Sequence, residues 1–464
     1  MKNNISKTQL PPLKDYSIKN ALKYGNFTTR FSALILGLGN MVHKQVAKGL
    51  CFLSAELLYI YYMVAFGVNS IINFVTLGTS EQTEVFNEEL GIYEYLLGDN
   101  SMLCLLYGVV TLFITLFFIM LMIASVKSAY HAQKDVERGI NPATFSKDLF
   151  ELKDHNLHVT LLTLPTLGVI LFTIIPLVFM IFIAFTNYDK NHLPPGKLFD
   201  WVGLENFKNI FSIGGSRGIG STFFPVLGWT LIWAFFATFT NYFLGMILAL
   251  LINRKGTKAK GFWRFNFVLS IAIPAFVSLL TMRTIFSESG PVNVLLRNWG
   301  IIDSSYSVPF WTDGGLAKVM VILVNIWIGV PYTMLQVTGI LQNIPTELYE
   351  AADVEGANAF TKFFKITLPY MLFVTGPYLI TTFIGNINNF NVIFLLTGGG
   401  PGNLDYYYAG KTDLLVTWLY KLTITEKDYK MGSVIGIMIF IISAVFSLIA
   451  YRHTAAYKNE ESFQ

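Results

Sequence analysis

Residues 350–369, EAADVEGANAFTKFFKITLP, form a polar, helix-forming stretch between two long apolar segments. The apolar segments cover residues 322–342 and 370–396, and each is long enough to cross a bilayer, which takes roughly 20 residues. Charged residues recur along the polar stretch, and charge is costly inside hydrocarbon. The stretch is therefore expected to lie at a membrane face, and its regular charges indicate that another protein docks on it.

The composition of the whole chain excludes an ordinary soluble protein. Of its 464 residues, 53% are hydrophobic and 13% are charged, whereas soluble domains carry about 25% charged residues. Apolar runs in a bilayer must form helices, because every backbone N–H and C=O needs a partner inside the segment. The sequence therefore predicts an all-α polytopic membrane protein. Eight runs are predicted to span the membrane, at residues 50–74, 102–126, 159–185, 224–252, 265–286, 319–340, 371–396 and 434–451.

The charges of the connecting segments predict the orientation of these spans. Lysine and arginine are enriched in short cytoplasmic loops, and they are frequent in the N-terminal tail and in the connections between spans 2 and 3 and between spans 4 and 5. The connection between spans 1 and 2 carries acidic residues and neither lysine nor arginine. We therefore expect both termini and residues 350–369 to face the cytoplasm.

The polar stretch is predicted to be a helical hairpin. Thr346 is expected to cap a helix that runs to Glu355, Gly356 to end it in the left-handed conformation, and a second helix to cover residues 358–366. Leu368 and Pro369 would then return the chain to the membrane. Spacing alone supports an ordinary loop between two spans equally well.

The stretch also contains a complete EAA motif, the mark of permease subunits of ABC importers. Its residues are Glu350, Ala351, Ala352, Gly356, Ile366, Leu368 and Pro369. Further segments resemble the MalF-type, maltose/maltodextrin family of permeases, with a type I importer core. They are FTNYD (185–189), VGLENFKNIF (202–211), NIWIGVPY (325–332), NINNF (386–390) and LLTGGGP (395–401). The resemblance covers residues 159–452.

This resemblance implies a domain organisation. Residues 1–49 would be a cytoplasmic tail with an interfacial helix over residues 31–49, and residues 50–158 would hold two additional spans and a cytoplasmic connection. Residues 159–452 would form the six-span permease core with its coupling loop at residues 346–369, and residues 453–464 a cytoplasmic tail. The loop at residues 186–222 is too short for the large extracytoplasmic domain of some relatives, which indicates the shorter form found in Gram-positive cell membranes.

The resemblance also implies partners. The motif would form the coupling helix that sits in a cleft of a separate ATPase subunit, with Glu350 facing that subunit. Two such ATPase subunits (MalK/MsmK-like) would bind ATP and Mg, so that this chain would hold no cofactor and would be no enzyme itself. The remaining partners would be a second, MalG-like permease subunit, an extracellular lipid-anchored sugar-binding protein and an oligosaccharide, with no nucleic acid.

Polar side chains gather on two of the predicted spans. Thr382, Asn386 and Asn389 share a helix face in span 7, and Asn325, Gly329 and Tyr332 share one in span 6. Hydrogen bonds between helices explain any single asparagine equally well. Uncharged amide, hydroxyl and aromatic groups nevertheless suit a neutral sugar.

By resemblance, the sugar-binding positions are Asn325, Ile328, Gly329, Tyr332, Thr382, Asn386 and Asn389. The family has a tyrosine and a serine where this chain has Ile271 and Ala275, on either side of Pro274. The loss of two hydroxyls changes how the pocket holds its ligand, and an α-glucoside is expected. Multiple-sugar, raffinose-type or other oligosaccharides remain open.

Two other classes of membrane protein are less well supported. An ion-coupled secondary transporter needs charged residues at mid-membrane, and spans 6 and 7 carry none. A membrane-embedded enzyme needs paired carboxylates or histidines within its spans, and we find no such cluster and no metal-ligand spacing. The glycine-rich run TGGGPG (397–402) lacks the Lys-Ser/Thr of a nucleotide-binding loop, and a turn is expected there.

Overall fold

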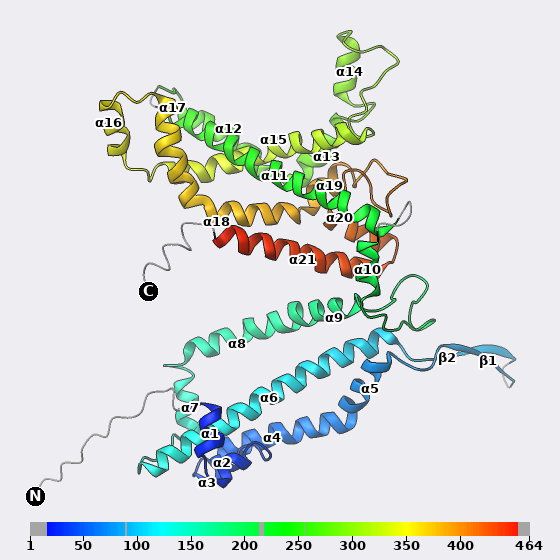
Figure 1. The fold of residues 1–464 in the computed structure, drawn as a ribbon, viewed down its shortest axis with the longest axis vertical. Coiled ribbons are helices and arrows are strands. Elements are labelled where there is room, and N and C mark those ends of the chain that lie inside the picture. Colours follow the sequence, from blue (N-terminus) through cyan, green and yellow to red (C-terminus); the bar gives the residue numbers. More distant parts are fainter. Residues whose placement is uncertain (1–15, 89–90, 213–217, 255, 453–464) are drawn as a thin grey trace, which may run out of the picture. The chain divides into compact units, whose positions relative to one another are not determined.

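A computed structural model describes residues 16–88, 91–212, 218–254 and 256–452 (Figure 1). The chain forms two compact units, of which the first ends at Trp201 and the second begins at Val202. This division lies inside residues 159–452, which were predicted as one permease core. That functional assignment stays a prediction.

The first unit contains three long membrane helices. They are α4–α5 (Val46–Tyr62 and Val68–Thr76, joined by a π-helical turn), α6 (Ser101–Glu137) and α8–α9 (Leu157–Val169 and Ile175–Ile183, also joined by a π-helical turn). The shorter elements are α1 (Ile18–Tyr24), α2 (Phe27–Phe31), α3 (Leu38–Val42), α7 (Phe145–Glu151) and the strands β1 (Thr83–Asn87) and β2 (Ile92–Leu96).

The predicted interfacial helix over residues 31–49 is wrong. Gly37 and Lys44 both have positive φ values, of 78° and 67°, so the chain turns twice and forms α2, α3 and the start of α4 instead. These short helices pack on the polar end of α6, where Gln133 accepts hydrogen bonds from Thr29 Oγ1 (2.8 Å) and Asn26 N (2.9 Å). Side chains of α6 thus supply the partners that the interrupted backbone needs.

The acidic connection between the first two spans folds as a β-hairpin that the sequence analysis did not predict. β1 and β2 are antiparallel, with Phe86 opposite Tyr93. Asp99 closes the base of the hairpin, because its carboxylate accepts from the N–H groups of Thr79 (2.8 Å) and Ser80 (3.1 Å). These bonds lower the pKa of Asp99.

The second unit holds the remaining membrane helices. Three of them are α11 (Ile219–Asn253), α15 (Gly314–Leu341) and α21 (Tyr429–Arg452), and a fourth runs from Ala359 to Ile387 through α17 (Ala359–Lys362), a π-helical turn and α18 (Leu368–Ile387). α12 (Lys260–Ala272) and α13 (Ala275–Ile285) form a pair bent by 88°. The shorter helices are α10 (Glu205–Phe211), α14 (Pro291–Asn298), α16 (Thr346–Val354), α19 (Phe390–Leu396) and α20 (Leu415–Tyr420).

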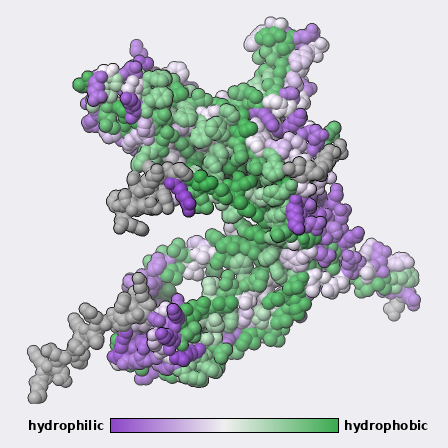
Figure 2. Space-filling model, in the orientation of Figure 1, coloured by the Kyte–Doolittle hydropathy of each residue, from purple (hydrophilic) through white to green (hydrophobic). Residues whose placement is uncertain are grey.

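The described residues therefore contain seven helices able to cross a membrane, or eight if the bent pair is one span. The fold class and the count of about eight spans are confirmed. The bend falls at Pro274, which has no N–H to continue the helix. In each unit, Figure 2 shows hydrophobic residues along the helices and hydrophilic residues gathered near their ends.

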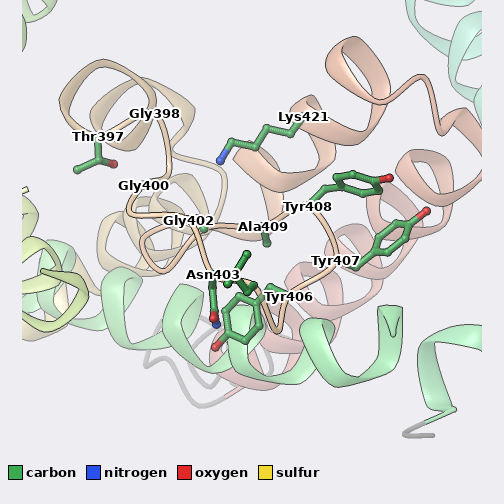
Figure 3. A pocket seen from close by; sticks show the side chains of 12 residues that line it. Thr397, Gly398, Gly400, Gly402, Asn403, Tyr406, Tyr407, Tyr408, Ala409 and Lys421 are labelled. Carbon is green, nitrogen blue, oxygen red and sulfur yellow. The ribbon is translucent and has the colours of Figure 1, made fainter. Parts of the chain in front are cut away.

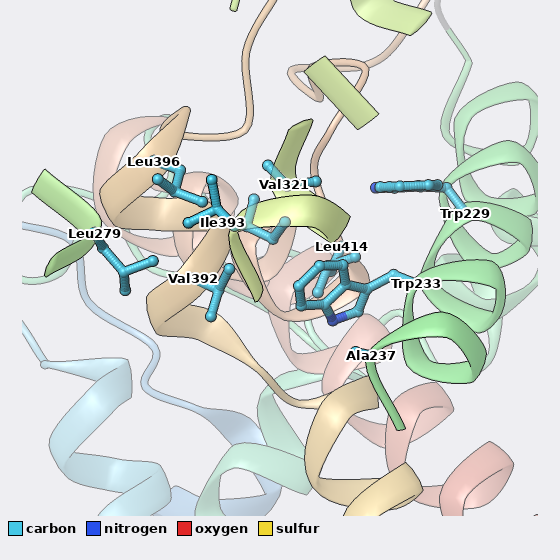
Figure 4. Packing of buried hydrophobic residues seen from close by; sticks show 10 residues of the cluster. Trp229, Trp233, Ala237, Leu279, Val321, Val392, Ile393, Leu396 and Leu414 are labelled. Carbon is cyan, nitrogen blue, oxygen red and sulfur yellow. The ribbon is translucent and has the colours of Figure 1, made fainter. Parts of the chain in front are cut away.

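The core of the second unit lies between α11, α13, α15 and α19. Trp233, which is fully buried, packs with Leu279, Val321 and Ile393 (Figure 4). Its indole N–H donates to the carbonyl oxygen of Asn386 at 3.1 Å. A second cluster includes Tyr242, Met334 and Met371, at the end of the helices nearer to α16.

An ion pair between Lys421 and the buried Asp413 holds the segment that follows α19. Asp413 is fully buried and accepts hydrogen bonds from Lys421 Nζ (2.6 Å), Gly410 N (2.7 Å) and Thr417 Oγ1 (2.9 Å). Burial raises the pKa of Asp413, while the Lys421 ammonium opposes that rise. Figure 1 places this segment at the end of the second unit opposite α16.

We predict that Lys421→Met destabilises the protein by about 3 kcal/mol, because it leaves the Asp413 carboxylate buried without its cation. The loss is measured as a lowered free energy of unfolding in detergent near neutral pH. Without the cation the folded pKa of Asp413 rises further above its unfolded value, so the loss shrinks as the pH falls toward about 4, where the carboxyl is protonated.

The matched control is Lys411→Met, because Lys411 is exposed and has no ion pair among the described residues. We expect the control to change the free energy of unfolding by less than about 0.5 kcal/mol. Equal losses in the two variants would contradict a stabilising role for the Asp413–Lys421 pair.

Candidate functional site

The polar stretch forms the predicted hairpin, with one correction at its start. α16 begins at Thr346 itself, preceded by Pro345 in an extended conformation, and no side chain caps its first N–H groups. Thr346 is therefore the first helical residue and not the cap. Gly356 has a φ of +74°, as expected for the turn. Asn358 caps the second arm, since its side chain accepts from Thr361 N at 2.8 Å.

The second arm differs from the prediction in a way that affects function. It does not end near residue 366 but continues without a break through α18 to Ile387. A π-helical turn, Phe363–Thr367, lies immediately before Leu368 and Pro369. Such a turn relaxes the regular bonding that the proline ring would disrupt. The hairpin arm and span 7 are thus one continuous helix, which contains this π-helical turn and Pro377.

The motif residues divide into an exposed set and an anchored set. Glu350, Ala351, Gly356 and Pro369 are exposed and Ala352 is half-buried, whereas Ile366 and Leu368 pack against the second core cluster. The Tyr349 hydroxyl forms a hydrogen bond with Thr367 Oγ1 at 2.9 Å, which connects α16 to the helix from Ala359 to Ile387. The hairpin is therefore held from inside and presents its outer face.

The outer face of the hairpin is unusually apolar for an exposed surface. The side chains of Val354 and Phe360 are 90% and 74% exposed, beside the carboxylates of Glu347, Glu350 and Glu355. Exposed apolar residues that are rimmed by charge mark protein interaction sites. The geometry suits docking into a cleft of another protein.

The polar face of span 7 lies at the other end of the helix that begins at Ala359. Asn386 donates to Thr238 Oγ1 of α11 at 3.0 Å, and Asn389 donates to Asn386 Oδ1 at 3.2 Å. Asn389 also caps α19 by accepting from Val392 N at 3.3 Å. Both asparagines therefore join helices in this structure, which is the alternative that the sequence left open.

The polar face of span 6 is divided between two neighbours. Asn325 is buried, and Gly329 packs so closely on Asn241 of α11 that a Cβ at position 329 would overlap the Asn241 carboxamide. Ile328 and Tyr332 point elsewhere, into a cavity of about 210 Å³ at the bend of α12 and α13. Sequence reasoning missed Asn241, although a polar residue in the apolar run TFTNYFLG is a signal for it.

The cavity brings together residues that are far apart in the sequence. Its lining comprises Ser270, Ile271, Ile273, Pro274, Ala275, Ser278, Trp327, Ile328 and Tyr332. Ile271 and Ala275 thus line the same cavity as Ile328 and Tyr332. Ser270 and Ser278 supply hydroxyls near the positions where two were expected to be lost. Thr382, Asn386, Asn389, Asn325 and Gly329 do not line this cavity, and Thr382 is half-buried on α18.

A larger cavity, of about 770 Å³, lies beside the glycine-rich run (Figure 3). Tyr406, Tyr408 and Lys421 are among its lining residues. Gly398 and Gly399 have φ values of +59° and +83°, which glycine adopts readily in a tight turn. The next helix after the run, α20, begins only at Leu415, so the run does not open a helix as the strand–loop–helix of a phosphate site does.

No group of three or more histidine, cysteine, aspartate or glutamate side chains among the described residues could hold a metal ion.

Comparisons with known proteins agree with this architecture. Residues 241–457 match the family described as binding-protein-dependent transport system inner membrane component. The maltodextrin transport system permease protein MalC of Streptococcus pneumoniae is 36% identical over 437 residues, 92% of this chain and 96% of that protein. The galactooligosaccharides transport system permease protein GanP of Bacillus subtilis is 34% identical, over 92% of this chain and 97% of that protein.

The fold is also seen in a solved structure. A bacterial alginate ABC transporter in complex with alginate pentasaccharide-bound periplasmic protein superimposes with a TM-score of 0.52 at 22% identity, over 65% of this chain and 94% of that chain. The coverage and identity of the sequence relatives establish the family. This chain belongs to the MalF-like permease subunits of binding-protein-dependent ABC importers, and it is a multi-pass membrane protein.

Proposed function

We propose that this chain forms the translocation path for a neutral oligosaccharide, a maltodextrin, in an ATP-driven importer. The observation that carries the proposal is the single helix from Ala359 to Ile387. One of its ends bears the exposed hairpin, and the other bears Asn386, which contacts Thr238 of α11. A movement imposed on the hairpin is transmitted to the polar face through helix, past a π-helical turn and Pro377, and not through a loop.

The partners in this proposal follow from the exposed face of the hairpin. Glu350 and the apolar residues around it dock in a cleft of one of two MalK/MsmK-like ATPase subunits, which bind ATP and Mg. A MalG-like permease subunit completes the path, and a lipid-anchored extracellular binding protein delivers the sugar. The solved alginate transporter, which carries a saccharide-loaded periplasmic protein, supports partners of this kind.

The orientation in this proposal follows the loop charges. The hairpin and both termini face the cytoplasm of a Gram-positive cell, and the segment around Asp413 faces outward. In unit 2 the hairpin and that segment lie at opposite ends of the membrane helices (Figure 1), as this orientation requires.

The proposed substrate follows from the lining of the path. The cavity at the bend of α12 and α13 has aromatic, hydroxyl and aliphatic groups and no charged side chain in its lining, which suits a neutral sugar ring. The relative named for maltodextrin favours an α-glucoside, and the relative named for galactooligosaccharides makes those sugars the second candidate. We assign Asn325, Ile328, Gly329, Tyr332, Thr382, Asn386 and Asn389 to substrate contact over the transport cycle.

Reversing the charge of the hairpin tests the coupling proposal. In the purified complex, Glu350→Lys is expected to lower sugar-stimulated ATP hydrolysis at least about tenfold. The lysine either repels a positive charge in the docking cleft of the ATPase subunit or leaves the group that pairs with Glu350 without a partner. Asp405→Lys, a change of the same charge at an exposed residue of the opposite end, is the control and is expected to have no effect. Full stimulation in Glu350→Lys would contradict the assignment of coupling to this residue.

Removing the aromatic ring from the cavity tests the path. Tyr332→Ala is expected to lower maltotriose uptake by about 5- to 10-fold, since ring contacts contribute on the order of 1 kcal/mol, while the complex still assembles. Tyr61→Ala, which removes an exposed tyrosine in the first unit, is the control. Wild-type uptake in Tyr332→Ala would remove this residue from the path. Competition by galactooligosaccharide decides between the two sugars.

A further inference from the structure

Two membrane helices of the second unit each carry a buried amide atom without a partner. The Oδ1 acceptor of Asn241 on α11 and the Nδ2 donor of Asn325 on α15 are both buried, and neither has a hydrogen-bond partner among the described residues. The Asn325 side chain belongs to a residue that is only 7% exposed. Such groups are rare in folded proteins because each unmade bond costs free energy, so each requires an explanation.

The two amides lie on surfaces that face each other. Asn241 packs on Gly329, and one turn further along both helices Gly245 packs on Thr333. The helices therefore run side by side in the same direction. Asn325 precedes Gly329 by one turn on the same face, so it lies beside the turn of α11 that leads to Asn241.

A third helix reaches the same level. Thr238, one turn before Asn241 on α11, accepts the hydrogen bond from Asn386 of α18. Asn386 in turn accepts from Asn389, so these two asparagines have partners. In this layer of polar residues, the side chains toward α18 are hydrogen-bonded to each other. Toward α15, Asn241 Oδ1 and Asn325 Nδ2 have no partner among the described residues.

We propose that Asn241 is a sugar-binding residue that acts together with Asn325. One hydroxyl of the sugar donates to Asn241 Oδ1 and accepts from Asn325 Nδ2. A hydroxyl has both a donor and acceptor lone pairs, so a single group satisfies both amide atoms. This inference rests on the proposed function, and it extends the binding surface to α11, which carries no position that the family resemblance assigned.

The chemistry of the pair also sets a preference. The two amides favour a sugar that has a hydroxyl at one particular position over an analogue that has a hydrogen atom there. Without the hydroxyl, the Asn241 acceptor and the Asn325 donor both remain unpaired. An amide pair contributes no charge, which fits a neutral saccharide. Asn241 is therefore assigned to substrate specificity and not to ATPase coupling.

The test measures direct binding to the purified complex of both permease and ATPase subunits, without the binding protein, so that its own sugar site does not contribute. Maltotriose and a series of monodeoxy maltoses are titrated against wild type, Asn241→Ala, Asn325→Ala and the double variant. Wild type is expected to bind one monodeoxy sugar about 5- to 10-fold more weakly than maltose. Asn241→Ala is expected to bind maltose about 5- to 10-fold more weakly than wild type does. The variant is also expected to bind maltose and the disfavoured monodeoxy maltose equally well.

The matched control is Thr240→Val on the same helix. The Thr240 hydroxyl bonds to the carbonyl oxygen of Phe236 in its own helix, so its removal is expected to change neither affinity nor discrimination. Asn241→Ser, which keeps a smaller hydrogen-bonding group, replaces Asn241→Ala in the series if the alanine variant does not assemble. It is expected to retain part of the discrimination.

Two outcomes overturn the inference alone. Unchanged discrimination in Asn241→Ala shows that the amide does not touch the sugar. Wild-type affinity in the double variant shows that the two amides serve each other as an interhelical pair, since removal of both partners is then nearly neutral. If the wild-type complex binds neither maltotriose nor galactooligosaccharide, the proposed function itself is wrong. The wild-type titration separates this outcome from the two outcomes that concern Asn241 alone.

Discussion

The structure of the second unit depends on one continuous helix that joins a polar hairpin to a polar face within the membrane. Its backbone continues through a π-helical turn, Phe363–Thr367, and past Pro377 to Ile387, so the hairpin and the polar face are joined by helix and not by a loop. Tyr349 and Ile344 fix the hairpin to the core. Under the proposed function, this continuous helix converts a change at its hairpin end into a displacement at its polar end.

The polar groups within the membrane helices divide by how well they are satisfied. Asn386 and Asn389 have partners and hold α11, α18 and α19 together, whereas Asn241 and Asn325 each retain a buried atom without one. In hydrocarbon an unmade hydrogen bond has no water to replace it. Under the proposed function, the unpaired atoms of Asn241 and Asn325 await the polyol in this state, whereas Asn386 and Asn389 exchange their present partners for the polyol during the transport cycle.

Opposite the hairpin, stability comes from a different source. The fully buried Asp413 organises a turn-rich segment through Lys421, Thr417 and a backbone N–H. This arrangement keeps irregular backbone satisfied beside a large open cavity. The two ends of the unit thus differ physically: one is an exposed, partly apolar surface and the other is a polar framework.

The sequence by itself determined the membrane class, about eight spans, the family and the left-handed turn at Gly356, because apolar length and motif spacing are local properties. Only the tertiary structure decided that the second hairpin arm and span 7 are one helix, that residues 31–49 break at Gly37 and Lys44, and that the acidic connection pairs as strands. It alone showed Asn241 beside Gly329 and Ser270 in the cavity. Those outcomes depend on which helix faces meet, and no spacing within one segment encodes the partner across the interface.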